Sequence, residues 1–338
     1  MNISGPGRGN HARSVRQKLL NLITVSTVPF VCVLAIAVTA FGIHSWRSTV
    51  SNVQAMTDIL HQMVDTTIRE SIVSYLHAKV ESAASTIDTL DRLQPQREST
   101  PSTTAVAEHL LATEVAHSGY IYVLDLDGKV VIHPDPQTQG RIIPHIEPVR
   151  TQLAQREGYL EYTWQNSFEP RPLAKALYMQ QYQRYGWIIS ASSYRHEFVE
   201  LIDPERLART IGAYSLAAES YSVVIDNQGV FVSHPDHPGR RISEFFRQDE
   251  ADRIMQALFS AAEGQLRYSW AGRPGEPRRP KLMFHRYLPD FDWVIATSVY
   301  LDSLQRPIVL IVVGVCLFVI VLFSSVIICG LHISHRLS

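Results

Sequence analysis

The sequence has few cysteines and almost no net charge. Its 338 residues include three cysteines, Cys32, Cys316 and Cys329, and all three lie in apolar runs near the ends of the chain. Because none lies in the long middle part, we expect neither a disulfide framework nor a CxxC metal site. The formal net charge is −1 at pH 7. That is not the strongly basic balance of a nucleic-acid-binding protein, so we expect no nucleic-acid partner.

Motifs that carry enzyme chemistry are also absent. The sequence holds no Gly-x-Ser-x-Gly, no glycine loop of the phosphate-binding kind and no His-Glu-x-x-His. A metal-like spacing, His234-Pro-Asp-His237, contains a proline that prevents the regular helix needed to aim such a pair at one ion. We therefore expect no enzyme activity, no cofactor and no metal.

Two long stretches lack any charged side chain. Residues 19–43 and 307–333 are each apolar for long enough to cross about 30 Å of hydrocarbon as a helix. Pro29 lies inside the first stretch, where a membrane helix tolerates a kink. The alternatives are a cleaved signal peptide, whose apolar region is usually about 7–15 residues long, and core helices of a large soluble protein. We interpret both stretches as membrane-spanning helices.

The basic residues before the first span predict its orientation. Residues 1–18 carry four basic residues and no acidic one, and such a segment stays on the cytoplasmic side of a membrane. Two spans place both ends of the chain on the same side. We therefore expect a cytoplasmic basic tail at 1–18, an external region at 44–306 and a cytoplasmic stub at 334–338.

The external region contains a motif that occurs twice. Residues 120–135 recur as residues 221–236 without a gap, and later matches follow in the same order at a slightly larger offset. The matched pairs include Tyr120/Tyr221, Asp125/Asp226, Gly128/Gly229, His133/His234, Glu157/Glu263, Tyr162/Tyr268, Trp164/Trp270, Lys175/Lys281, Trp187/Trp293 and Tyr194/Tyr300. Two sets of matches in one order indicate two copies of one domain.

Each copy is predicted to hold about five antiparallel strands. In the first copy, alternating patterns and turn residues place the strands at 120–124, 129–133, 159–164, 175–181 and 187–192. Short helices are expected at 105–117 and 150–156. The modules then span 105–200 and 219–306, with a linking helix within 201–218 that starts at Asp203-Pro204.

A long helical pattern precedes the modules. Between residues 44 and 93, apolar side chains recur at spacings of three and four without an internal proline or glycine. A continuous helix of this length would reach roughly 70 Å. We expect it to run along both modules and to offer part of its apolar stripe to a partner helix, which predicts a homodimer. Two shorter helices are the alternative.

These features together resemble a known family. The motifs GYIYVLDLDGKVVIHPD and SYSVVIDNQGVFVSHPD, with the closing strands YGWIISASSY and FDWVIATSVY, resemble the Cache type 2 pattern. The chain is thus similar to a double Cache, PAS-like extracytoplasmic sensor domain of a bacterial transmembrane receptor. The resemblance implies an α+β fold with two transmembrane helices, a long stalk helix and two PAS-like (Cache) antiparallel-sheet modules.

The resemblance also implies a function and a location. It implies a multi-pass protein of the bacterial inner membrane with residues 44–306 in the periplasm or outside the cell. It implies sensing of a small molecule, often a short carboxylate, by the membrane-distal module 105–200, with 219–306 as the membrane-proximal module. Residues 332–338 resemble the start of a HAMP-type linker to a signalling output. A ligand-binding or scaffold protein that acts through a separate partner is the alternative.

Candidate ligand-binding residues follow from strand alternation. A carboxylate requires a cation or several donors inside a concave, largely apolar cup. Lys175 lies on a strand near several aromatic residues and is our candidate for that cation. The candidates in the first module are Tyr120, Tyr122, His133, Tyr162, Trp164, Lys175 and Tyr178, and those in the second are Tyr221, His234, Tyr268, Lys281 and His285. The alternative is that the aromatic rings are core and Lys175 reaches solvent.

The two repeated histidines have their own interpretation. His133 and His234 end the second strand of each hairpin, directly before Pro-Asp. Because both copies keep this residue, we favour an imidazole bonded to the backbone of the turn over one that lines the mouth of a pocket.

Overall fold

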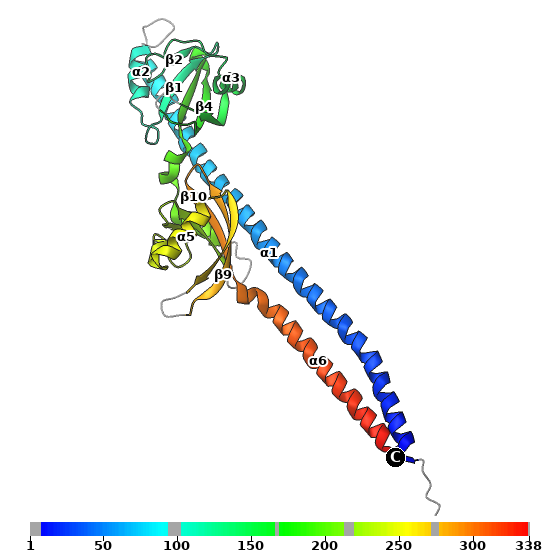
Figure 1. The fold of residues 1–338 in the computed structure, drawn as a ribbon. Coiled ribbons are helices and arrows are strands. Elements are labelled where there is room, and N and C mark those ends of the chain that lie inside the picture. The colour runs from blue at the N-terminus through cyan, green and yellow to red at the C-terminus, as the bar shows by residue number, and fades with distance from the viewer. Residues whose placement is uncertain (1–7, 94–102, 166–168, 213–219, 272–276, 337–338) are drawn as a thin grey trace, which may run out of the picture.

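The computed structural model describes residues 8–93, 103–165, 169–212, 220–271 and 277–336 (Figure 1). The helices are α1 (Arg8–Leu93), α2 (Thr103–Leu111), α3 (Glu147–Gln155), α4 (Pro204–Gly212), α5 (Gln248–Phe259) and α6 (Leu301–Arg336). The strands are β1 (Tyr120–Asp125), β2 (Val130–Ile132), β3 (Glu157–Trp164), β4 (Leu173–Tyr182), β5 (Trp187–Tyr194), β6 (Ser220–Asp226), β7 (Phe231–Ser233), β8 (Glu263–Trp270), β9 (Arg279–Leu288) and β10 (Trp293–Tyr300). Short 3₁₀ helices are η1 (Gln183–Tyr185), η2 (Arg195–Leu201) and η3 (Ile242–Glu244).

The strands form two sheets with the same topology. The first has the order β2-β1-β5-β4-β3 and the second has the order β7-β6-β10-β9-β8, and all pairs are antiparallel. We call the first sheet with α2 and α3 the distal module and the second with α5 the proximal module, according to their distance from α6 (Figure 1). The matching order confirms the predicted duplication, the five strands per module and the α+β fold.

Helix α1 is a single helix of 86 residues that runs past both modules (Figure 1). The alternative of two shorter helices is therefore wrong. Pro29 lies inside the helix without ending it. The apolar side chains of α1 form one stripe that packs against both sheets, and most are fully buried: Leu60, Val64, Ile68, Ile72, Leu76, Val80 and Ile87.

Burial of this stripe corrects one expectation. We predicted that part of it would stay free for a partner helix, but the chain's own sheets cover it. Ile59 and the terminal Leu93, at 51% and 72% exposure, are the exceptions among the large apolar side chains of this stretch. The exposed face of the same stretch is polar, with Thr66, Ser74 and Ser85 among its residues. Any partner of this part of α1 must therefore meet a polar surface.

Strand alternation gives each sheet two different faces. On the distal sheet, Ile121, Ala176 and Ile189 face α1 and join its apolar cluster. Their neighbours on the opposite face form a separate cluster below α3, which includes Leu177 and Met179. The proximal sheet has the same division, with a second cluster beneath α5. The face away from α1 is therefore the one that a small ligand can reach.

Turn chemistry explains why the hairpins β1–β2 and β6–β7 form. The carboxylate of Asp125 accepts backbone N–H groups of Asp127 (3.0 Å) and Lys129 (2.8 Å), and Asp226 makes the equivalent pair of bonds. Gly128 and Gly229 follow at φ of 80° and 75°, a conformation that side chains with a Cβ rarely adopt. This confirms the predicted turns.

Two helix predictions need correction, and a third can be followed only in part. The helix expected at 105–117 ends at Leu111, and Ala116 has a positive φ of 49° that no helix contains. The helix expected at 150–156 starts earlier, at Glu147, with Pro148 in its first turn. The linking helix is present as α4, whereas its predicted extension to Ala218 lies outside the described residues.

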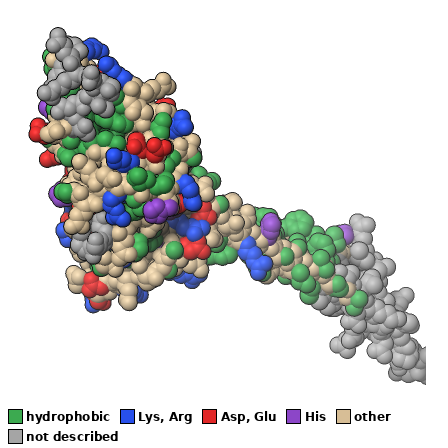
Figure 2. Space-filling model, turned by 90° about the horizontal axis from the view of Figure 1, so that it is seen from above, with side chains coloured by type: hydrophobic (Ala, Val, Ile, Leu, Met, Phe, Trp, Pro, Cys, Tyr) green, Lys and Arg blue, Asp and Glu red, His purple; other side chains and the backbone are tan. Residues whose placement is uncertain are grey.

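Among the described residues, two helices are long and apolar enough to cross a membrane: α1 from Pro29 onward, and α6 over Val309–Cys329. The parts of α1 and α6 that extend beyond the modules form a helical arm. Figure 2 shows hydrophobic side chains gathered along the described part of this arm, whereas the surface of the modules carries a mixture of polar, charged and hydrophobic side chains. The cysteines Cys32, Cys316 and Cys329 lie on this arm as free thiols. Helix α6 begins directly after β10, so the proximal sheet is joined to the second span without a loop.

Candidate functional site

Lys175 lies at the centre of an aromatic cage on the outer face of the distal sheet. Its Nζ is 4.9 Å from the centroid of the Tyr120 ring and 4.6 Å from that of Tyr194. The side chain is only 2% exposed. Within the described ranges its ammonium makes these ring contacts and no hydrogen bond, so its three donors remain for another partner.

Burial alters the acidity of this lysine. Desolvation lowers the pKa of Lys175 to about 8, and the negative charges of Glu169 and Glu197 partly oppose that shift. Glu169 accepts the hydroxyl of Tyr194, and Glu197 accepts Ser118 and Ser193, so both carboxylates are held by other groups. At pH 7 most of the lysine is still charged, as recognition of an anion requires.

A network of hydrogen bonds holds α3, the helix that covers this face of the distal sheet, against the strands. Gln152 of α3 is fully buried, and its Oε1 accepts the hydroxyls of Tyr122 (2.9 Å) and Ser190 (2.8 Å). Its Nε2 donates to the carbonyl of Pro148 at 3.1 Å. Burial raises the pKa of Tyr122 well above its ordinary value. The Tyr122 hydroxyl thus already donates its hydrogen bond to Gln152. Tyr122 therefore shapes the cup, but its hydroxyl proton is not available to a ligand.

Tyr162 and Trp164 lie on the cage face, as alternation predicted. The Tyr162 hydroxyl is 3.1 Å from Oγ of Ser192, which donates to the carbonyl of Ala176 at 3.0 Å. The rings of Tyr162 and Trp164 meet edge to face at 6.3 Å. Together they form one wall of the cup beside Lys175.

Tyr178 is not part of this cup. Its ring lies 4.7 Å from the ring of His77 on α1, on the opposite face of the sheet. The cause is the period of two along β4, because Lys175, Leu177 and Met179 face outward while Ala176 and Tyr178 face α1. The structure therefore separates Tyr178 from the other candidates of the distal module.

His133 serves the turn and borders the cage. Its Nδ1 accepts the backbone N–H of Asp135 at 3.0 Å, which confirms the favoured interpretation. Its ring is also 5.1 Å from that of Tyr120. Burial lowers its pKa, so the ring is neutral at pH 7 and carries its proton on Nε2.

The proximal module repeats the cage. Nζ of Lys281 lies 3.6 Å from the ring centroid of Tyr221 and 4.3 Å from that of Tyr300. Tyr268 and Ser298 pair at 3.0 Å, as Tyr162 and Ser192 do in the distal module. Nδ1 of His234 accepts the backbone N–H groups of Asp236 and His237. Burial and the nearby His237 and Lys281 lower the pKa of His234 to about 3.

In the proximal module, side chains fill most of the space inside the cage. Phe231, Phe246 and Trp270 line its interior and leave a void of only about 10 Å³, close to the least that holds one water molecule. His285 packs over Gly264, where a Cβ would come within 2.5 Å of Nε2. Of the proximal candidates, Tyr221, His234 and Tyr268 line this small void, whereas His285 does not.

Several residues of the distal site were missed in the sequence. Tyr194 could have been found, because it matches Tyr300 in the repeat. Gln152, Ser190 and Ser192 carry no signal of their own, since nothing in the sequence pairs α3 with β1 and β5. Nor do the described ranges hold any group of three or more His, Cys, Asp or Glu side chains that could bind a metal ion.

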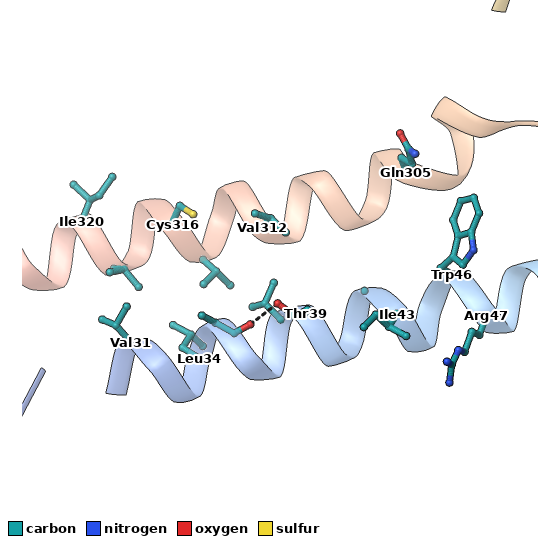
Figure 3. Close-up of a pocket in the computed structure, with 15 residues that line it drawn as sticks. Val31, Leu34, Thr39, Ile43, Trp46, Arg47, Gln305, Val312, Cys316 and Ile320 are labelled. Atoms are coloured by element: carbon teal, nitrogen blue, oxygen red, sulfur yellow. Dashed lines mark hydrogen bonds between the residues drawn. The ribbon is translucent and has the colours of Figure 1, made fainter. Parts of the chain in front are cut away.

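A larger hollow lies between α1 and α6 (Figure 3). It measures about 820 Å³ and is lined mainly by apolar side chains such as Leu34, Val312 and Ile320, with Trp46 and Arg47 at one end. It lies in the part of both helices that could cross a membrane. It is a gap between two apolar helices, and its lining lacks the convergent polar groups of a metabolite site.

The two sheets on one long helix, each with a caged lysine beneath a helical cover, define a tandem PAS-like ligand-binding protein carried on membrane-type helices. A family model described as Cache domain, of the double type 2 kind, matches residues 42–305. The chain belongs to this family of sensor domains. Among curated proteins, none matches the sequence.

Solved structures of the same class are similar to this chain. A methyl-accepting chemotaxis protein from Vibrio parahaemolyticus shares 16% identity over 43% of this chain and 99% of its own, with a TM-score of 0.34. A Cache chemosensory domain described for carboxylic acid recognition shares 16% over 40% and 97%, with a TM-score of 0.32. The sensor domain of the V. cholerae histidine kinase DctB shares 12% over 75% and 98%, with a TM-score of 0.29. TM-scores this low leave the family model as the basis of the assignment.

Proposed function

We propose that this chain is the sensor part of a membrane receptor and that its distal module binds a small organic acid. The observation that carries the proposal is the ammonium of Lys175, which is buried between two tyrosine rings with its hydrogen-bond donors unused among the described residues. A buried charge without a bonded partner is costly. A carboxylate at this position would supply the missing bonds.

The surroundings of Lys175 favour a small ligand. Tyr162 and Trp164 supply apolar walls, while the neutral His133 can donate from Nε2 at the edge of the cage. A hydrogen bond to a charged group contributes about 1.5–3 kcal/mol. The proximal copy has the same lysine but no free space, so we assign ligand binding to the distal module.

The proposed placement follows from the two apolar helices. They cross the bacterial inner membrane, with the basic residues before α1 in the cytoplasm and residues 44–306 in the periplasm or outside the cell. We place the distal module 105–200 away from the membrane, and the proximal module 219–306 next to it. Because α6 continues directly from β10, a displacement of the proximal sheet moves the second span.

The proposed receptor works as a homodimer through α1. The polar face of α1, with Ser74 on it, is the surface that remains for such a contact. Crosslinking of a Ser74→Cys variant in membranes tests this contact, and a variant that stays monomeric under oxidation contradicts it. Ligand can shift the receptor only by binding its two states with different affinity.

The test of ligand binding is a thermal-shift screen of the full chain in nanodiscs against organic acids, amines and amino acids. We expect one or more short carboxylates to raise the midpoint for the wild type and for Lys281→Met, and to leave Lys175→Met unchanged. Lys281→Met is the matched control because it removes the same charge from the equivalent cage. Equal shifts in wild type and Lys175→Met would contradict the proposal, as would a response to amines alone.

A further inference from the structure

Arg195 occupies the junction where α1, the distal module and the proximal module meet. Its guanidinium bonds Asp65 of α1 through Nη2 at 2.9 Å. Nη1 bonds Glu161 of β3 and Asp290 of the turn after β9, each at 2.9 Å. The arginine is 7% exposed, whereas the side chains of its partners Asp65, Glu161 and Asp290 are 40%, 31% and 29% exposed. One side chain thus links the three parts of the molecule.

The residues of this junction are the direct chain neighbours of cage residues. Arg195 follows Tyr194, whose ring contacts Lys175. Glu161 precedes Tyr162, which forms the wall of the cup. Because successive side chains of a strand point to opposite faces, a strand that moves on the cage side must also move at the junction.

From this geometry we propose that the Arg195 cluster transmits the state of the Lys175 cage to α1 and the proximal module. The inference rests on the proposed ligand site and names the route by which that site is coupled to the rest of the chain. It assigns to Arg195 a linking role, since Arg195 itself faces away from the cage.

The cluster has the properties of a link with two arrangements. The single guanidinium of Arg195 bonds three carboxylates. Breaking a buried ion pair leaves an uncompensated charge. A carboxylate that loses its bond to Arg195 must therefore be solvated by water or become protonated. Desolvation and the charges of Glu161 and Asp65 raise the pKa of Asp290. A cleft of about 570 Å³, lined by Arg195, Asp290 and Phe291 among others, lies beside the cluster and gives the modules room to move.

Among the described residues, the proximal module does not repeat this cluster at the equivalent positions, although Arg286 makes its own ion pairs with α1 and β8. At the repeat offset, Leu301 corresponds to Arg195 and Arg267 corresponds to Glu161. Leu301 is the first residue of α6. The two cages are thus followed by different segments, and the proximal cage leads directly into the membrane-type helix α6.

The test removes the proximal partner of Arg195 without removing the arginine. In Asp290→Asn, Arg195 keeps Asp65 and Glu161, so the fold is retained. The matched control is Asp292→Asn, which makes the same charge change two residues along the turn, where the carboxylate binds Asn227 and Tyr287 instead. Hydrogen exchange of the full chain in nanodiscs, without any added ligand, is the measurement.

The informative segments are β1 and β4, which carry the cage residues Tyr120 and Lys175. We expect Asp290→Asn to speed exchange there at least about threefold, and Asp292→Asn to leave them unchanged. If Asp290→Asn speeds hydrogen exchange only within Arg195–Leu201, the cluster stabilises its surroundings only locally and the proposal is wrong. Equal effects of the two variants on β1 and β4 would also refute it, because they would indicate a general loss of charge.

A second arm uses reciprocity between linked sites. Acetate, propionate, pyruvate and succinate serve as probes, and Asp290→Asn should change the Kd of any that binds by threefold or more while Asp292→Asn does not. An unchanged Kd for a bound probe counts against the coupling. If none of the carboxylates in the wider screen binds the wild type, the proposed function fails, whereas the ligand-free exchange experiment still decides the coupling.

Discussion

The distal and proximal modules have the same sheet topology and the same caged lysine, but different side chains surround the two cages. In the distal module, the cover is α3 with the polar Gln152, and the bonds of the network end on Tyr122 and Ser190. In the proximal module, aromatic side chains reach inward and fill the space. The comparison teaches that the strands preserve the framework, while the residues that cover each sheet differ between the modules.

The largest effect is expected where the proximal cage is filled. Phe246 is buried against Trp270 (5.5 Å between ring centroids) and Tyr268 (6.0 Å). Phe246→Ala should lower the free energy of unfolding by about 3–5 kcal/mol, because it removes a buried ring and leaves a cavity. Hydrogen exchange of β8 and β10 measures this loss. Leu153→Ala in the half-buried distal cover should cost clearly less, and equal losses would remove the contrast between the modules.

Replacing each of the two lysines in turn tests the comparison directly. Lys175→Met should weaken carboxylate binding about 10–100-fold, which corresponds to the loss of one charge-assisted hydrogen bond. Lys281→Met should leave the affinity unchanged, since its cage is closed. Isothermal titration of both variants in nanodiscs with the best acid from the screen provides the measurement. A loss in Lys281→Met and none in Lys175→Met would reverse the assignment of the modules.

The pH dependence of binding follows from the lowered pKa of Lys175. Only the protonated lysine attracts a carboxylate, and it loses its proton as pH rises through about 8. The affinity should therefore fall as pH rises, by roughly tenfold between pH 7 and pH 9. Titration at several pH values checks this, with Lys175→Met as the control that should show a flat profile. An affinity that increases over this interval would be incompatible with a lysine–carboxylate pair.

The smallest effects separate the two faces of the distal sheet. Tyr178→Phe should change ligand affinity by less than about twofold, because Tyr178 contacts α1. Tyr122→Phe should reduce stability by about 1 kcal/mol through the lost bond to Gln152. Chemical denaturation and titration of both variants give the two quantities. A marked loss of affinity in Tyr178→Phe would place that ring in the cup after all.

Local patterns predicted much of the fold. The period of two along the strands, the Asp-x-x-Gly turns and the spacing of apolar residues along α1 are properties of neighbouring residues, and each sheet and the long helix follow from them. The contacts of Gln152 and Phe246 with their sheets join residues from separate elements. No local pattern encodes them, so the polar cover and the filled cage were not foreseen.

Sequence alone determined the duplication, the two apolar helices and the identity of the repeated lysine, because each is written in composition or period. Only the tertiary structure decided that the stripe of α1 is covered by its own sheets, that Tyr178 faces α1, and that Arg195 meets partners on three elements. The physical reason is that burial and ion pairing depend on which surfaces meet after folding. Residues as distant as Asp65 and Asp290 come together only when both modules lie along one helix.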